Sequence, residues 1–278
     1  MLRHTFCHVP SIGLKRERSL WACGLRSWGD LAGLQPGLIS PGLLTALRAH
    51  IPVSLERLNS GDLAYFGERI PSDQTWRLFT ELRPAVAFVD IETTGLTPRY
   101  DQVTTISIYD GNSVRYYVAG IDIEQFQHDI AVYRLIVTYN GKCFDVPFPR
   151  ESLGIYLNQC HIDLRYVLGS LGYRGGLKAC EVRLGIDRGA LSDVDGYFAV
   201  LLWQEYQNTG NQAALDTLLA YNIEDVVNLE KLMVLAYNEK LKATPFENEL
   251  RLPEPPEPYR PLQPDLALVS RIQSRSMR

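Results

Sequence analysis

Residues 86–96 of this 278-residue chain read VAFVDIETTGL, an apolar run that carries Asp90 and Glu92 two positions apart. A run this hydrophobic predicts a buried β-strand. Because side chains at positions i and i+2 of a strand point to the same face, both carboxylates should lie together at the end of a core element. Two buried like charges repel each other unless a cation lies between them, and oxygen ligands favour a divalent metal ion. The stretch therefore predicts a strand that binds metal.

Two later segments offer further ligands. A second apolar run, residues 135–138, is followed by YNGKCFDVPF at 139–148, which places an acid just past the end of a strand. Apolar residues three and four positions apart predict a helix over 211–240, on which a tyrosine and an aspartate four residues apart share a face. The candidate residues are Asp90, Glu92, Asp145, Tyr221 and Asp225.

The three segments resemble a known family. The order D-I-E-T-T-G, N-G-x-x-F-D-x-P-F and Y-x-x-x-D resembles the three motifs of the DEDD 3′–5′ exonucleases, and the tyrosine is typical of the DEDDy branch. The second motif is also similar to that of family B DNA polymerase proofreading domains, and residues 176–186 look like a stretch of stand-alone bacterial RNase H-like proteins of poorly known function. The resemblance covers roughly residues 84–240. Each motif is short, but three in this order make a strong joint signal.

The resemblance implies a role for each candidate in a site with two Mg²⁺ or Mn²⁺ ions. Asp90 would bridge both ions, while Glu92 and Asp225 would complete the site of the attacking water. Asp145 would hold the second ion, directly or through water, and Tyr221 would orient the water. Spacing alone indicates only that these groups can converge.

Each main candidate also has a simpler interpretation. A lone aspartate at a strand end is most often a cap or turn former, and Asp145 before Val-Pro-Phe fits a helix N-cap. Tyr221 taken alone fits a core aromatic residue with its hydroxyl at the surface. The ordered combination of four acids and one tyrosine favours the catalytic interpretation over these.

A second group of residues could contact the substrate. The resemblance implies that the turn after the first acids meets the terminal nucleotide, although a plain turn is the alternative there. For Phe144 the alternative is a core aromatic residue, and for Lys178 it is an exposed lysine at the start of a helix. The residues are Thr93, Thr94, Gly95, Leu96, Asn140, Phe144 and Lys178.

The chain as a whole is expected to be an α/β protein with an RNase H-like fold, a mixed five-stranded sheet flanked by helices. Gly111-Asn112, after Asp110, predicts a hairpin turn between the second and third strands. The expected strands lie near 85–91, 103–109, 113–119, 134–139 and 160–165. The expected helices of this domain lie near 147–157, 164–172, 176–184, 194–208 and 211–240.

Segments on either side of this domain (84–240) have a different character. Residues 1–80 predict a small helical region, with helices at 41–50 and 53–65, that is either a cap contacting nucleic acid or a purely structural one. Residues 245–278 are rich in proline and predict a flexible, extended tail. The tail could dock onto a protein partner that the sequence does not identify.

Bulk composition is that of an ordinary soluble protein, with 46% hydrophobic and 22% charged residues. No membrane span and no secretory signal are expected. Five scattered cysteines without a C-x-x-C pair fit reduced thiols in the cytoplasm and make structural zinc unexpected. The net charge is −4, but residues 1–60 carry seven basic against three acidic side chains. This asymmetry fits contact with phosphates or a solvated basic face equally well.

Together these observations predict a metal-dependent 3′–5′ exonuclease that hydrolyses phosphodiester bonds of single-stranded DNA or RNA. The alternative is a catalytically inactive RNase H-like protein that binds nucleic acid or acts as a scaffold. The complete set of acids favours the enzyme, because an inactive copy would commonly have lost at least one ligand.

Overall fold

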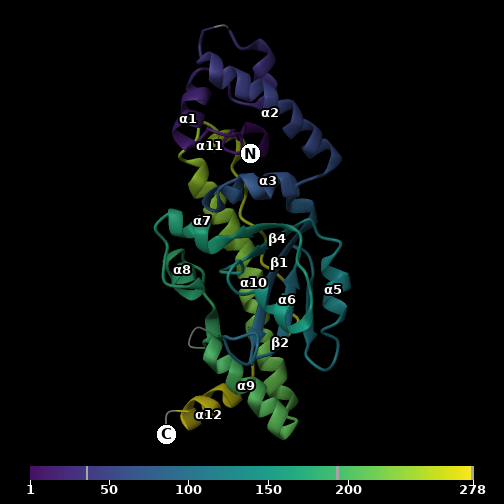
Figure 1. Ribbon diagram of the computed structural model, residues 1–278. Coiled ribbons are helices and arrows are strands. Elements are labelled where there is room, and N and C mark those ends of the chain that lie inside the picture. Colours follow the sequence, from purple (N-terminus) through teal and green to yellow (C-terminus); the bar gives the residue numbers. More distant parts are fainter. Residues whose placement is uncertain (36, 192–193, 277–278) are drawn as a thin grey trace.

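A mixed sheet forms the centre of the computed structural model, which describes residues 1–35, 37–191 and 194–276. The sheet has five strands in the order β3-β2-β1-β4-β5, and the molecule is elongated along the direction of its longest helix (Figure 1). The strands are β1 (Val86–Thr93), β2 (Val103–Tyr109), β3 (Val114–Val118), β4 (Leu135–Thr138) and β5 (Cys160–Asp163). The predicted α/β, RNase H-like architecture is confirmed.

Strand pairing explains why the sheet is mixed. The hairpins β1–β2 and β2–β3 are antiparallel, whereas β4 lies parallel to both β1 and β5. Asp90 and Glu92 on β1 lie opposite Ser107 and Thr105 on β2. Only Val86 to Phe88 of β1 pair with β4, so the acidic end of β1 extends past its parallel neighbour.

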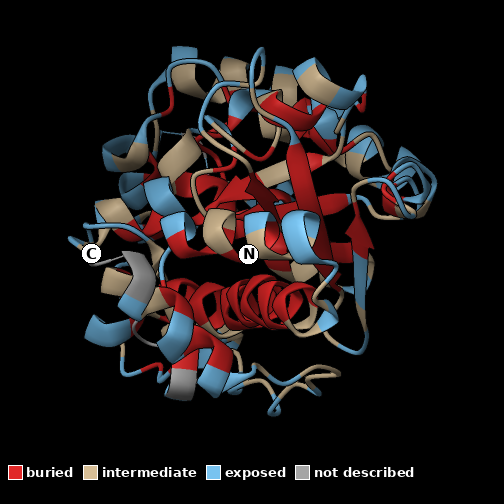
Figure 2. Ribbon diagram, turned by 90° about the horizontal axis from the view of Figure 1, so that it is seen from below, coloured by how far each residue is buried: buried red, intermediate tan, exposed pale blue. Residues whose placement is uncertain are grey.

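Helices cover both faces of the sheet. The long helix α10 (Gln212–Leu241) packs across β1 and β2, while α5 (Gln125–Ile130) and α6 (Pro147–Leu153) supply buried side chains to the opposite face. Figure 2 shows the buried residues concentrated in the sheet and in the long helix beside it. The other helices of this domain are α7 (Leu164–Ser170), α8 (Leu177–Arg183) and α9 (Gly196–Thr209). Only the short helix α5 lacks a counterpart in the sequence analysis.

The N-terminal region is helical, as its sequence indicates. Its hydrophobic side chains belong to the same cluster as those of β1 and α10, and Trp76 packs edge-on against Tyr237 at 5.3 Å. Its α-helices are α1 (Leu14–Ala22), α2 (Pro41–Ser60), α3 (Ala64–Arg69) and α4 (Phe79–Leu82). Short 3-10 helices span Leu2–His4, Trp28–Gly33, Ser72–Leu78, Arg83–Ala85 and, further along the chain, Gly189–Leu191.

Helix α2 differs from the prediction of two helices, at 41–50 and 53–65. It runs unbroken through Pro52, although proline lacks the N–H that would bond to the preceding turn. Leu47, Ile51 and Ser54 are buried on either side of the proline, and Ser54 Oγ lies 2.8 Å from Nε2 of His8. Packing of this face keeps the helix continuous.

The C-terminal segment differs from the predicted flexible tail. After α11 (Glu247–Leu250), residues 251–265 are extended, but Leu266–Ser276 form helix α12. Leu268, Val269 and Ile272 bury one side of α12 in a cluster with α9 and the first part of α10. Proline content explains the extended part, while apolar side chains three and four apart explain the helix. Within the described ranges, no helix has both the length and the hydropathy of a membrane span.

Candidate functional site

The first two acids lie on the face of β1 that α10 covers. Val89 and Ile91 point to the opposite face, into the cluster with α5 and α6, so the alternation of the strand places Asp90 and Glu92 together. Glu92 is buried, and Asp90 is half-buried. The sequence prediction that both carboxylates share one face therefore holds.

Helix α10 brings the third motif to the same place. Tyr221 and Asp225 are both buried on it, and both face the end of β1. Asn222, between them, donates a hydrogen bond from Nδ2 to Oδ2 of Asp90 at 2.7 Å. Its own oxygen accepts bonds from Ser107 on β2 at 2.7 Å and from Thr105 at 3.2 Å. Asn222 thus fixes one oxygen of Asp90 and ties the helix to the sheet.

The resulting acidic cluster consists of Asp90, Glu92 and Asp225, with one carboxylate oxygen from each lying within 4.8 Å of the others. Burial, followed by the charges of neighbouring carboxylates, raises the pKa of Asp90 and of Glu92 well above the ordinary values. Burial also raises the pKa of Asp225. Oxygen donors at this spacing with strong mutual repulsion fit a divalent cation, because the cation would neutralise charges that the fold holds together.

Asp145 lies beside the cluster but is not one of its three members. Its Oδ1 accepts a hydrogen bond from the backbone N–H of Ile91 at 3.2 Å, at a level of β1 that β4 does not reach. Burial raises the pKa of Asp145 to about 7. The N-cap of α6 is Val146, and no side chain caps that helix, so Asp145 is not the helix cap that its position allowed.

Arg188 and Glu181 belong to the site although the sequence analysis does not name them. The guanidinium of Arg188 donates to Oδ1 of Asp225 and, at 3.1 Å, to Oε1 of Glu181. All three side chains are buried, and Asn228 donates to Glu181 at 3.0 Å. Arg188 thereby neutralises part of the charge of the acidic cluster.

Lys178 lies on the same side of the site. Its Nζ is 5.3 Å from the centre of the Tyr221 ring, and Arg188 lies 5.8 Å from the same centre. Burial and the charge of Arg188 lower the pKa of Lys178. Burial and the charges of Asp225 and Glu92 raise the pKa of Tyr221, so its phenol is neutral near pH 7. The interpretation of Lys178 as a plain surface lysine does not describe its surroundings.

The turn after β1 is held by its own side chains. Thr93 Oγ1 donates to the carbonyl of Gly95 at 2.5 Å, and Thr94 accepts from the N–H of Gln102 at 3.0 Å. A Cβ on Gly95 would overlap the carboxylate of Asp101, which explains glycine at this position. Leu96 is 83% exposed at the tip, so this apolar side chain is available to a ligand.

The remaining two candidates have different surroundings. Asn140 follows β4 in the left-handed region, with φ of 69°, and its side-chain oxygen accepts a hydrogen bond from Arg165. Phe144 is partly buried and packs 5.2 Å from Phe148, which favours its interpretation as a core residue. A Cβ on Gly141 would overlap Thr138, which explains why glycine follows Asn140 in the second motif.

A comparison with protein families agrees with this fold. A family model of the RNase H superfamily matches residues 87–237, and the chain belongs to that superfamily. No curated protein matches the chain.

Solved structures with a similar fold include three of low sequence identity. A family B DNA polymerase from the hyperthermophilic archaeon Pyrobaculum calidifontis is 19% identical over 56% of this chain, with a TM-score of 0.43. This chain covers only 24% of that polymerase. A structure described as the apo form of the nuclease is 18% identical, covers 69% of this chain and 83% of its own, and has a TM-score of 0.42. Brucella melitensis NrnC is 18% identical, with coverages of 72% and 87% and a TM-score of 0.38.

Proposed function

We propose that the chain is a metal-dependent 3′–5′ exonuclease that hydrolyses phosphodiester bonds of single-stranded DNA or RNA. The observation that carries the proposal is the acidic cluster of Asp90, Glu92 and Asp225, formed by β1 and α10 in a member of the RNase H superfamily. Asp145 against the same strand and Tyr221 on the same helix complete the set that the exonuclease motifs require.

We expect the carboxylates to hold two divalent ions, Mg²⁺ or Mn²⁺. When bound, such a pair supplies a hydroxide-like water near neutral pH and neutralises charge on the leaving oxygen. Asn222 holds Oδ2 of Asp90 in place, which orients that carboxylate between the two sides of the site. Glu92 and Asp225 would hold an ion together with Asp90, and Asp145, which accepts from the N–H of Ile91, would hold the second ion.

Tyr221 has a restricted role in this proposal. Because its pKa is raised, its hydroxyl keeps its proton near pH 7 and can donate a hydrogen bond to the attacking water or to the phosphate. The phenol therefore orients the nucleophile and does not act as the general base. Lys178 beside it provides a positive charge for the substrate phosphate.

A nuclease assay on the full chain tests the proposal. Oligonucleotides of DNA and RNA, single- and double-stranded and labelled at the 5′ end, are incubated with Mg²⁺, with Mn²⁺ or with EDTA. We expect a ladder that shortens from the 3′ end on single strands, in the presence of metal only. The same preparation of Asp90→Asn should give no ladder. Equal cleavage by both proteins would indicate a contaminating nuclease and contradict the proposal.

One observation favours a second candidate, a non-catalytic protein that binds nucleic acid. Arg188 already pairs with Asp225, so a cationic side chain takes part of the role that a metal would have. This candidate predicts that the wild-type chain binds labelled oligonucleotides but leaves them intact with Mn²⁺. The assay above therefore distinguishes the two candidates.

A further inference from the structure

A cavity of about 840 Å³ lies between the end of β4, helix α7 and the start of α8. Two arginines and three tyrosines are among its lining residues, and no lining residue in the described part of the chain is acidic. We call it the tyrosine–arginine pocket, after Tyr139, Arg165, Tyr166, Tyr173 and Arg174. Its volume is within the range of about 300–1,000 Å³ typical of ligand pockets.

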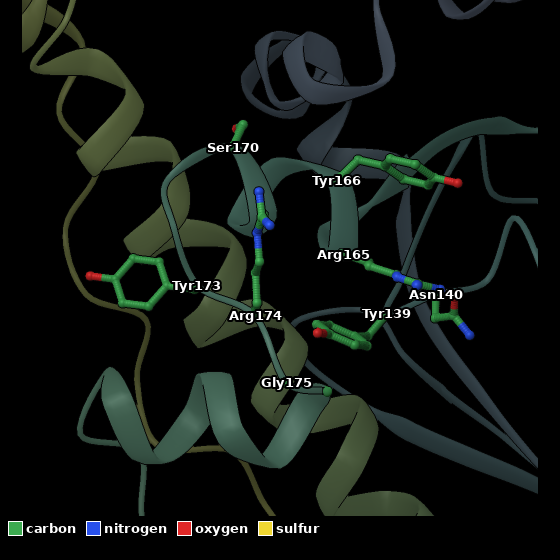
Figure 3. Close-up of a pocket in the computed structure, with 10 residues that line it drawn as sticks. Tyr139, Asn140, Arg165, Tyr166, Ser170, Tyr173, Arg174 and Gly175 are labelled. Carbon is green, nitrogen blue, oxygen red and sulfur yellow. Dashed lines mark hydrogen bonds between the residues drawn. The ribbon is translucent and has the colours of Figure 1, made fainter.

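Neither arginine of this pocket forms an ion pair with a carboxylate in the described part of the chain. Arg174 is exposed on the loop between α7 and α8 and has no hydrogen-bond or ion-pair partner among the residues that the structure describes. Among the described residues, the guanidinium of Arg165 donates only to the neutral side chain of Asn140. Figure 3 shows Arg174 in the middle of the pocket and Arg165 reaching toward Asn140. Unpaired guanidinium groups in an overall acidic chain fit the oxygen atoms of phosphate groups.

The tyrosines provide aromatic faces, two of which are held in place. The hydroxyl of Tyr139 lies 3.5 Å from Sγ of Cys180, and Arg183 lies 5.0 Å from the centre of the Tyr173 ring. Tyr166 on α7 is 39% exposed. Aromatic rings beside a positively charged groove are the usual means of holding an unpaired strand, because bases stack on the rings whatever their sequence.

Two segments of the chain connect the lining of the pocket with residues of the proposed active site. Asn140 lines the pocket, and Asp145 follows five residues later in the same loop. Gly176 lines it as well, and Lys178, two residues further along, lies over Tyr221. The pocket is therefore lined by segments that lead directly to residues of the proposed active site.

We propose that the tyrosine–arginine pocket binds the nucleotides on the 5′ side of the scissile bond, with phosphates at Arg165 and Arg174 and unpaired bases on the tyrosine rings. The orientation rests on the proposed function, since a 3′–5′ exonuclease places the 3′-terminal nucleotide at the metal site. Stacking requires bases that are not paired, so the pocket selects single-stranded over duplex substrate.

Binding is tested with the full chain in EDTA, where no hydrolysis takes place. Fluorescein-labelled hexanucleotides, dT₆ and U₆, are titrated over a range of salt concentrations. We expect Arg174→Ala to weaken binding and to reduce the slope of log K against log salt by about 0.7, the value for one phosphate contact with a single strand. The double variant Arg165→Ala/Arg174→Ala should lose about twice as much slope. Arg251→Ala, an exposed arginine of the C-terminal segment, is the charge-matched control and should behave as wild type.

The aromatic contribution has its own matched pair. Tyr166→Leu should weaken hexanucleotide binding roughly fivefold or more, because one stacked base contributes about 1–3 kcal/mol. Tyr166→Phe keeps the ring and should bind as wild type. Since Tyr166 is exposed, neither change should alter the melting temperature.

Kinetics with Mn²⁺ separate this inference from the proposed function. The p-nitrophenyl ester of thymidine 5′-phosphate has no nucleotide on the 5′ side, so Arg174→Ala should leave its hydrolysis unchanged while raising KM for dT₆. If both substrates are cleaved and all pocket variants match wild type, the pocket inference is wrong and the exonuclease stands. If neither substrate is cleaved but binding depends on Arg174, the exonuclease is wrong and the pocket stands as a binding site for single strands.

Discussion

The guanidinium of Arg188 donates a hydrogen bond to Oδ1 of Asp225, and it binds the buried carboxylate of Glu181 at the same time. Burial raises the pKa of Asp225, and Arg188 opposes that rise. One cation therefore balances two carboxylates at the edge of a cluster whose other members repel each other. This arrangement explains how the chain can fold around its acids before a metal binds.

Replacing Arg188 should be costly for this reason. Arg188→Met leaves Glu181 and Asp225 buried without their cationic partner, and breaking a buried ion pair on one side destabilises proteins by about 3–5 kcal/mol. Urea unfolding in EDTA measures the loss. The double variant Glu181→Gln/Arg188→Met should recover part of it. A decrease in the free energy of unfolding of less than roughly 1 kcal/mol in the single variant would mean that the ion pairs of Arg188 do not stabilise the fold.

Removing a carboxylate from the cluster should have the opposite effect on stability. In Asp90→Asn the repulsion from Asp225, Asp145 and Glu92 disappears, while the side-chain oxygen can still accept from Asn222. We expect the metal-free variant to melt above wild type by about 2–4 °C for each kcal/mol gained. Its nuclease activity should fall roughly 10³-fold or more, since Asp90 would be a ligand to both ions in the proposed function. An inactive variant that melts below wild type would argue against charge repulsion in the native site.

Stability of the metal-free protein should depend on pH through Asp145. Its pKa is raised from 3.8 to about 7, so the folded state favours the protonated form. The resulting stabilisation, at most about 4 kcal/mol, is complete below pH 4 and is lost as the pH rises through 7. His8 and His161, whose pKa values burial lowers to about 3, act in the opposite direction.

Comparison with a variant isolates this contribution. The difference in free energy of unfolding between wild type and Asp145→Asn, measured in EDTA, should change in favour of the variant between pH 5 and pH 8. Adding Mn²⁺ should remove the trend, because a bound cation favours the charged carboxylate. A difference that stays constant with pH would show that Asp145 titrates normally.

Strands and the long helix can be predicted because their residues carry a strong periodic or apolar signal. The run at 103–109 consists mainly of β-branched residues and ends at a hairpin turn, and the observed strand has the same bounds. Tyr221 and Asp225 share a face by helical geometry alone. The four-residue spacing therefore predicts, without any knowledge of tertiary contacts, that the two residues of the third motif lie on one face of the helix.

The parts of the site that the sequence does not predict are held by long-range polar contacts. Arg188 lies between α8 and α9 outside any periodic element, and it meets Asp225 only because α10 returns along the sheet. Asn222 gives a weak clue, since it is a polar residue in the middle of an apolar helix. Its partners on β1 and β2 are more than a hundred residues away in sequence. Helix α5 has too few residues to show periodicity.

Tyr221→Phe should separate chemistry from binding. The aromatic ring keeps its contacts with Lys178 and Arg188, whereas the hydroxyl that would orient the water in the proposed function is removed. We expect kcat to fall by about 10²-fold, with KM and melting temperature close to wild type. Single-turnover hydrolysis of a labelled oligonucleotide is the measurement. A variant with wild-type kcat would show that the tyrosine is only a packing residue.

The C-terminal segment should stabilise the helix that carries the third motif. Arg260 binds both oxygens of Glu224, at 2.6 and 3.1 Å, and Glu224 is buried next to Asp225 in the chain. Hydrogen bonds to charged groups contribute about 1.5–3 kcal/mol, so Arg260→Ala should lower the free energy of unfolding by about that amount. Arg260→Lys, which cannot bond in two places, should recover only part of it. Because Glu224 is not one of the three acids of the cluster, kcat should not change in either variant. Loss of activity without loss of stability would instead place the segment in the catalytic site.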